Sequence, residues 1–114
     1  MVDRQLYKLH ASICHTLSNP KRLEIIEKLR TCEMSVTELA GALGISQSNL
    51  SQHLALMRQR GILTSRREGL NVFYSLSNPK ISQACDLMRQ VLLEHLEAGA
   101  ELAREGSTKL ETLA

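Results

Sequence analysis

The sequence predicts a mainly α-helical protein with one small β-hairpin. Three observations lead to this fold class. Hydrophobic residues make up 43% of the 114 residues but aromatic residues only 3%, so the core must be mostly aliphatic, which suits packed helices better than a β-sandwich. Apolar residues recur at spacings of three and four over most of the chain, as on the buried face of a helix. One short stretch after residue 70 instead alternates apolar and polar residues, as a strand does.

Two helices are predicted in the first part of the chain. The first covers residues 4–17, where the apolar spacing is helical. Ser18 or Asn19 is expected to cap the second helix, because short polar side chains accept hydrogen bonds from the free amides of a helix start. Pro20 suits the first turn of that helix, which is expected over about 20–31.

Two further helices are predicted next, joined by a turn of about four residues. The first begins near Val36, with Ser35 or Thr37 as its cap, and Gly44 suits its C-terminal end. The second is expected over about 46–60 and begins with a serine that can cap it. Two helices joined in this way are typical of a helix-turn-helix.

A β-hairpin is predicted directly after these helices. Residues 62–66 and 72–76 are expected to form two strands, with the sequence REGLN as the turn. A hairpin in this position makes the arrangement a winged helix-turn-helix, and the wing is expected over residues 66–71.

The last predicted helix follows a second Ser-Asn-Pro sequence and is expected to end near residue 102. The chain is thus expected to form one domain over residues 1–103 and a disordered tail over residues 104–114. No apolar run is long enough for a membrane span, and no apolar N-terminal segment indicates a signal peptide. The three cysteines are too few and too scattered for a disulfide framework, which favours a cytoplasmic location.

The predicted helix over 46–60 carries an unusual number of polar side chains in its first half. They are Gln47, Ser48, Asn49, Ser51, Gln52 and His53. Amide, hydroxyl and imidazole groups can bond to base edges in the major groove of DNA, which admits one α-helix. Leu50, Leu54 and Met57 are expected to face the core instead. An ordinary solvent-exposed face is the alternative.

The predicted wing supplies two arginines, Arg66 and Arg67. Residues 46–80 hold five basic side chains and only one acidic side chain, so this part of the chain is where an anionic partner is expected. Arginines on a wing can lie on the DNA backbone or in the minor groove, where they add affinity rather than sequence choice. A solvated hairpin tip is the alternative for both.

Three stretches carry a resemblance to a known family: LSNPKRLEIIEKL, MSVTELAGALGISQSNLSQHLALMRQRGIL and REGLNVFYSLSN. Together they resemble the ArsR/SmtB-type winged-helix transcriptional repressors over about residues 10–96. The resemblance implies a homodimer formed through the first and last helices. It also implies binding to a palindromic operator in double-stranded DNA, and repression that an inducer relieves. The polar residues at positions 47, 48, 51, 52 and 53 would then lie in the groove.

The sequence does not decide between three classes of inducer, which are a thiol-reactive species, a metal and a metalloid. Family members that sense cadmium or arsenic carry ELCVC, whereas Ser35 and Thr37 stand at the cysteine positions here. The zinc pattern of the last helix is also missing, since Met88 and Ala98 replace expected ligands. No cofactor is therefore assigned, although a metal or metalloid ion stays possible.

The three cysteines are candidate sensor residues. Cys32 and Cys85 match the redox-sensing members poorly, because one lies later and the other earlier than those members require. Cys14 could pair with Cys85, or could act with His15 and a residue of a second subunit. The simpler expectation is that Cys14 and Cys85 are buried packing residues and that Cys32 is more exposed.

Two other classes of function compete with DNA-dependent repression. An enzyme is not expected, because the sequence has no glycine-rich phosphate loop, no metal-ligand spacing and no nucleophile beside a base. A winged helix used for protein–protein contact would need apolar residues where this chain has glutamine, serine and arginine. A DNA-binding regulator without a ligand of its own is the remaining alternative.

Overall fold

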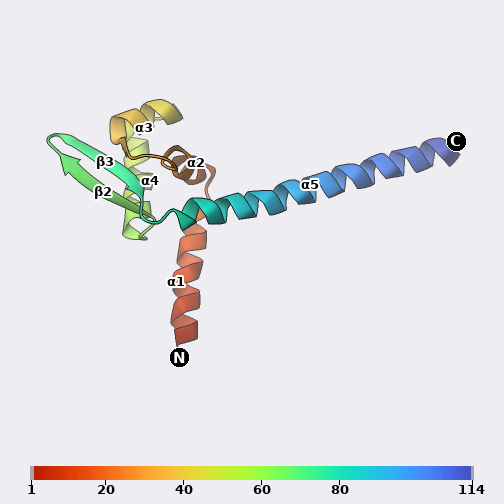
Figure 1. Cartoon of the computed structure of the whole chain (residues 1–114), viewed down its shortest axis with the longest axis horizontal. Helices are drawn as coiled ribbons and strands as arrows, with labels where there is room; N and C mark the ends of the chain where they lie inside the picture. Colours follow the sequence, from red (N-terminus) through yellow and green to blue (C-terminus); the bar gives the residue numbers. More distant parts are fainter. Residues whose placement is uncertain (1, 114) are drawn as a thin grey trace. The chain divides into compact units, whose positions relative to one another are not determined.

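The computed structural model describes the backbone of residues 2–113 and the side chains of residues 3–106. The elements, in chain order, are α1 (Val2–Leu17), α2 (Pro20–Lys28), β1 (Met34–Ser35), α3 (Val36–Leu43), α4 (Gln47–Gln59), β2 (Leu63–Glu68), β3 (Asn71–Leu76) and α5 (Lys80–Leu113). They form two compact units, Met1–Ser82 and Gln83–Ala114 (Figure 1). The mainly helical fold class with a small sheet is confirmed.

Polar side chains cap the helices where the sequence indicates. Asn19, one of the two candidates for α2, accepts hydrogen bonds from the backbone N–H groups of Lys21 (2.9 Å) and Arg22 (3.2 Å). Ser35, one of the two candidates for α3, exchanges hydrogen bonds of 3.1 Å with Glu38 in a capping box. Each cap satisfies amides that a helix start leaves without a partner.

The helix-turn-helix consists of α3 and α4. Gly44 ends α3 with φ 66°, a left-handed conformation that costs glycine little. Ser46 then caps α4 by accepting a hydrogen bond from the backbone N–H of Asn49 at 3.2 Å. Only two residues, at positions 45 and 46, separate Gly44 from the first residue of α4, and the two helices are in contact with each other.

The sheet has three antiparallel strands in the order β1-β3-β2, whereas the sequence predicts only a two-stranded hairpin. The additional strand, β1, pairs Met34 with Tyr74 on β3 and was missed because two residues are too short for an alternating pattern. The hairpin strands are also longer than predicted. β2 continues to Glu68, so that the turn is reduced to Gly69 and Leu70.

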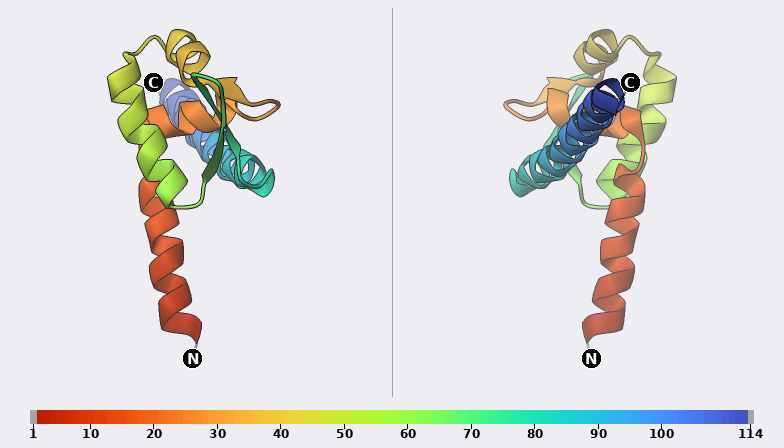
Figure 2. Two further views of the ribbon diagram at one scale, coloured as in Figure 1. Left: turned by 90° about the vertical axis from the view of Figure 1, so that its left-hand side faces the viewer. Right: turned by 90° about the vertical axis from the view of Figure 1, so that its right-hand side faces the viewer.

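The core of the first unit lies where α2, α3, α4 and the sheet meet. Leu50, Leu54 and Met57 of α4 are 0% exposed, as the helical spacing predicts. The remaining buried apolar residues are Ile25, Ile26, Leu29, Leu39, Ala40, Ile62 and Leu63. Within this unit α4 contacts β2 and α3 contacts β3. Figure 2 shows the ribbon from two further sides. This packing fixes which side of α4 faces the solvent.

The last helix, α5, begins as expected and ends later than expected. Asn78 accepts a hydrogen bond from the backbone N–H of Lys80 at 2.9 Å, so the second Ser-Asn-Pro sequence does act as a cap. The helix then continues to Leu113, and the predicted end near residue 102 was wrong. The division into a domain over residues 1–103 and a disordered tail over residues 104–114 stays a prediction.

Candidate nucleic-acid interface

The polar residues of α4 lie on the side of the helix opposite the core. Gln47, Ser48, Asn49, Ser51 and Gln52 are exposed, and His53 is half-buried. The structure thus brings together all six residues that the sequence selects on this helix. Their amide, hydroxyl and imidazole groups form a surface that is rich in hydrogen-bond donors and acceptors and carries no acidic side chain. We call these six residues the polar face of α4.

The start of α4 is tied to the start of α3 by a side-chain contact. Gln47 donates a hydrogen bond from Nε2 to Oγ1 of Thr37, with a distance of 3.4 Å. The hydroxyl groups of Ser46 and Ser48 lie 3.3 Å apart. From the sequence Thr37 is expected only as a candidate cap. No local pattern predicts its contact with Gln47, because the two partners are ten residues apart. Thr37 is exposed and extends the polar face onto α3.

His53 is held by an arginine from another helix. Nε of Arg22, on α2, donates a hydrogen bond to Nδ1 of His53 at 3.1 Å. Burial of the imidazole lowers the pKa of His53, and the positive charges of Arg22 and Lys21 lower it further. These effects favour the neutral form of the imidazole. Arg22 is not among the residues that the sequence predicts at this interface, because it is 31 positions from His53 and no local pattern links the two.

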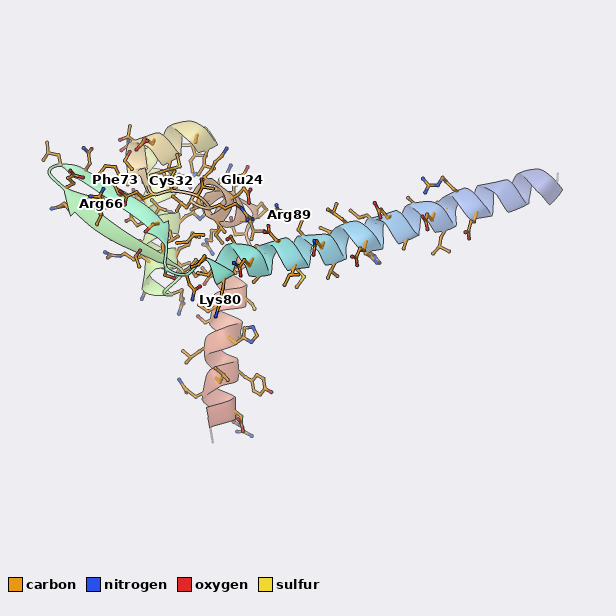
Figure 3. All side chains as sticks on the ribbon, in the orientation of Figure 1. Glu24, Cys32, Arg66, Phe73, Lys80 and Arg89 are labelled. Carbon is orange, nitrogen blue, oxygen red and sulfur yellow. The ribbon has the colours of Figure 1, made fainter. Side chains whose placement is uncertain are left out.

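Arg66 is engaged within its own chain. Its guanidinium forms an ion pair with Glu33, donating from Nε to that carboxylate at 2.9 Å, and also donates from Nη1 to Glu68 at 2.8 Å. It lies over the ring of Phe73, 4.6 Å from the centroid, and Figure 3 shows the two residues on the hairpin. These contacts lower the pKa of Glu33 and raise the pKa of Arg66, chiefly through the hydrogen bond between them.

Arg67, the next residue along β2, is exposed. Successive side chains of a strand point to opposite faces, so Arg67 does not share the contacts of Arg66. It has no ion pair with any of the residues whose side chains the structure describes. Both arginines lie in β2, whereas the sequence predicts them near and within a flexible turn. Arg67 is thus the wing arginine whose charge is available to an anionic partner.

The three cysteines lie on different parts of the chain. Cys14 on α1 and Cys32 in the loop after α2 are both exposed, so the expectation that Cys14 is buried was wrong for the single chain. Cys85 on α5 is half-buried. Among the described residues, no group of three or more histidine, cysteine, aspartate or glutamate residues is placed to hold a metal ion. No helix within the described residues is long and apolar enough to cross a membrane.

Comparison with known proteins assigns the chain to a family. Residues 19–65 match the family described as "Bacterial regulatory protein, arsR family". The chain is 37% identical over 110 residues to Rv0081 of Mycobacterium tuberculosis, described as an uncharacterized HTH-type transcriptional regulator. That match covers 87% of this chain and 96% of the relative. The crystal structure of Rv0081 gives a TM-score of 0.74 at 39% identity, over 81% of this chain and 93% of that chain.

Two other relatives carry opposite descriptions. HlyU of Vibrio cholerae, described as a transcriptional activator, is 40% identical over 75 residues, or 66% of this chain and 69% of the relative. PagR of Bacillus anthracis, described as a transcriptional repressor, is 34% identical over 82 residues, or 71% of this chain and 82% of the relative.

A further solved structure is described as a homodimeric winged helix-turn-helix DNA-binding domain from Mycobacterium bovis. It matches with a TM-score of 0.77 at 28% identity, over 84% of this chain and 89% of that chain. The family and these relatives are transcriptional regulators and not enzymes. The prediction that the chain is not an enzyme is therefore confirmed. The chain is a member of the ArsR family of winged helix-turn-helix transcriptional regulators.

Proposed function

We propose that this protein is a sequence-specific, dimeric repressor that binds a palindromic operator in double-stranded DNA. The observation that carries the proposal is the polar face of α4, which is exposed while Leu50, Leu54 and Met57 on the opposite side are 0% exposed. A helix held in this way can enter the major groove with its polar side toward the base edges. The wing over residues 66–71 would lie on the backbone or in the minor groove.

The exposed apolar side chains support a dimer. On α1, Leu6, Tyr7 and Leu9 are 57%, 71% and 56% exposed. On α5, the exposed apolar residues are Leu87, Met88, Val91, Leu92, Leu93, Leu96 and Leu102. Apolar surface of this extent marks a protein interface, and a second copy that covers both helices would bury it. Two copies related by a dyad would present two α4 helices to two half-sites.

Repression, rather than activation, is the direction that we propose, in line with the description of PagR. A dimer that occupies a promoter blocks transcription without any further contact, whereas activation needs an additional surface for the transcription machinery. An inducer, either a thiol-reactive species or a metal or metalloid ion, would relieve the repression. Because the target is the chromosome, we place the protein in the cytoplasm.

Fluorescence anisotropy with the DNA upstream of the protein's own gene tests this function. The reduced, metal-free protein is titrated onto that DNA and onto a scrambled duplex of equal length, at several salt concentrations. We expect preference for the upstream DNA and a steep loss of affinity with salt, because lysines and arginines release counterions from the phosphates they contact. Salt-independent binding, or equal affinity for both duplexes at every salt concentration, would contradict a sequence-specific regulator.

The same titration identifies the class of inducer. The protein–DNA complex is treated with a mild thiol oxidant or a persulfide donor, and separately with divalent metal ions. Loss of DNA binding on treatment with the thiol reagents would identify a thiol sensor. The reacting residue would be the one whose substitution, among Cys14→Ser, Cys32→Ser and Cys85→Ser, prevents that loss. Loss of binding with a metal ion alone would assign a metal sensor. Unchanged binding under all conditions would indicate a regulator without a ligand of its own.

A further inference from the structure

A single arginine joins three helices of the first unit. Nε of Arg22 on α2 donates to Nδ1 of His53 on α4, and Nη1 of Arg22 donates to the backbone carbonyl of Thr16 near the end of α1. Both distances are 3.1 Å. The guanidinium is planar and rigid, so two hydrogen bonds made in different directions fix its orientation. Thr16 is only 1% exposed, and this link therefore ends inside the protein.

The hydrogen bond between Arg22 and His53 determines which nitrogen of the imidazole carries the proton. A neutral imidazole has one donor nitrogen and one acceptor nitrogen, and an arginine only donates. Nδ1 of His53 must therefore accept, which leaves the proton on Nε2. Protonation of Nδ1 would break the bond and place an imidazolium beside a guanidinium. The lowered pKa of His53, caused by burial and by Arg22 and Lys21, agrees with this state.

His53 is one of the six residues of the polar face of α4. His53 lies one helical turn after Asn49 and directly after Gln52, both of which are exposed. The ring is half-buried, and Nδ1 is the nitrogen on the side of Arg22. We infer that Arg22 is a positioning residue for DNA recognition, which holds the His53 ring in one orientation with its proton on Nε2. His53 then meets the DNA as a neutral hydrogen-bond donor.

A neutral donor acts differently from a cationic one. It can bond to an acceptor on the DNA, such as a phosphate oxygen, N7 or O6 of guanine, or O4 of thymine. Because it carries no charge, it releases no counterion and adds nothing to the salt dependence of binding. This role rests on the proposed function, since it needs DNA at the polar face of α4. The protonation state of the His53 imidazole in the free protein does not depend on the proposed function.

NMR of the imidazole nitrogens in the full chain without DNA tests the first half of the inference. Two-bond ¹H–¹⁵N spectra distinguish the two neutral forms, and His53→Gln assigns the signals. We expect the Nε2–H form in the wild type at pH 7.5. In Arg22→Gln we expect a mixture of both forms and a higher pKa for His53. The Nδ1–H form in the wild type, or identical spectra and pKa in the variant, would overturn the inference.

Two further variants separate the hydrogen bond from the charge. Lys21→Gln removes the same charge from the neighbouring residue, whose side chain pairs with Glu24 at 2.8 Å. We expect it to keep the Nε2–H form. Arg22→Lys keeps the charge but replaces the two fixed donor nitrogens of the guanidinium by one flexible ammonium, and we expect it to lose the single form, as Arg22→Gln does. It also replaces Arg22→Gln if that variant does not fold. If Lys21→Gln changed the form as much as Arg22→Gln, the charge alone would be responsible and the inference would fail.

Anisotropy on the upstream DNA tests the second half. We expect Arg22→Gln and His53→Ala each to weaken binding about five- to tenfold, as the loss of one hydrogen bond does, with an unchanged salt dependence. The double variant should bind no more weakly than His53→Ala. Additive losses, or a salt slope that falls by about one in Arg22→Gln, would show a direct phosphate contact by Arg22 and overturn the inference. If the wild type does not bind this DNA, the proposed function fails, while the NMR result still decides the state of His53.

Discussion

The carboxylate of Glu33, in the loop before β1, accepts hydrogen bonds from the guanidinium of Arg66 on β2, with 2.9 Å between Oε2 and Nε. The pair joins the hairpin to the segment that leads into β1. The hydrogen bond lowers the pKa of Glu33 from its ordinary value of 4.5. The contribution of this pair to stability is thus fully present above pH 4.5 and is lost as the pH falls through the lowered pKa. At neutral pH Arg66 is held beside Glu33 and Glu68, and its charge is already balanced.

The first prediction concerns the two wing arginines. We expect Arg67→Ala to weaken binding to operator and scrambled DNA by similar factors and to lower the salt slope by about one, because its charge is available to a phosphate. Arg66→Ala should change the salt slope less, because two carboxylates already neutralise this guanidinium. Anisotropy at four or more salt concentrations measures both slopes. Equal changes in salt slope for the two variants would contradict the conclusion that Arg67, and not Arg66, has its charge available to the DNA.

The second prediction is the complement of the first. Glu33→Gln removes one of the two carboxylates beside Arg66 and leaves only Glu68, so this arginine is held less firmly and less negative charge opposes the DNA. We expect tighter binding to both duplexes and a steeper salt dependence than in the wild type. Glu24→Gln, an exposed carboxylate on α2 that pairs with Lys21, is the matched control for the loss of one negative charge. An equal gain in affinity for both variants would show a general charge effect and not release of Arg66.

The third prediction assigns base recognition to Gln52. Its exposed amide can make two hydrogen bonds to an adenine edge, and such a contact discriminates by about 1–3 kcal/mol against the wrong base. We expect Gln52→Ala to lower the ratio of operator affinity to scrambled-DNA affinity, with little change for the scrambled duplex. Anisotropy on both duplexes measures this ratio. If the affinity for both fell equally, Gln52 would contact the backbone and not a base.

The fourth prediction tests the core that supports α4. Leu54 is 0% exposed, and Leu54→Ala should destabilise the fold by about 2–5 kcal/mol through lost burial and a cavity. Gln52→Ala lies on the exposed side of the same helix and should change stability by about 0.5 kcal/mol or less. Denaturant unfolding followed by circular dichroism, at one fixed protein concentration, measures both. A similar loss in the two variants would mean that the polar face is also needed for folding.

The fifth prediction follows from the lowered pKa of His53. In the unfolded chain this histidine takes up a proton near its ordinary pKa of 6.5, whereas in the folded protein it stays neutral to a lower pH. Stability is therefore complete above about pH 6.5 and falls as the pH drops below it. We expect His53→Gln to remove part of this fall between about pH 7 and pH 5.5, as measured by thermal unfolding. An identical pH profile in wild type and variant would contradict a neutral His53 in the fold.

Much of the first unit could be predicted from the sequence alone because its signals are local. Helical spacing placed Leu50, Leu54 and Met57 in the core, and therefore the polar face of α4 in solvent. Caps could be predicted for the same reason, since a side chain such as that of Asn19 or Ser46 bonds to amides two or three residues away. These features depend on the order of neighbouring residues and on helix geometry, both of which are written in the sequence.

Tertiary structure decided the features that join distant residues. The strand β1 exists only because β3 lies beside it, and Arg66 meets Glu33 only because folding brings the two residues together across 33 positions. Arg22 likewise meets His53 across 31 positions. Sequence alone indicated which side chains could contact DNA. The fold determined which of them are already held by partners, because a hydrogen bond between remote residues depends on packing and leaves no periodic signal in the chain.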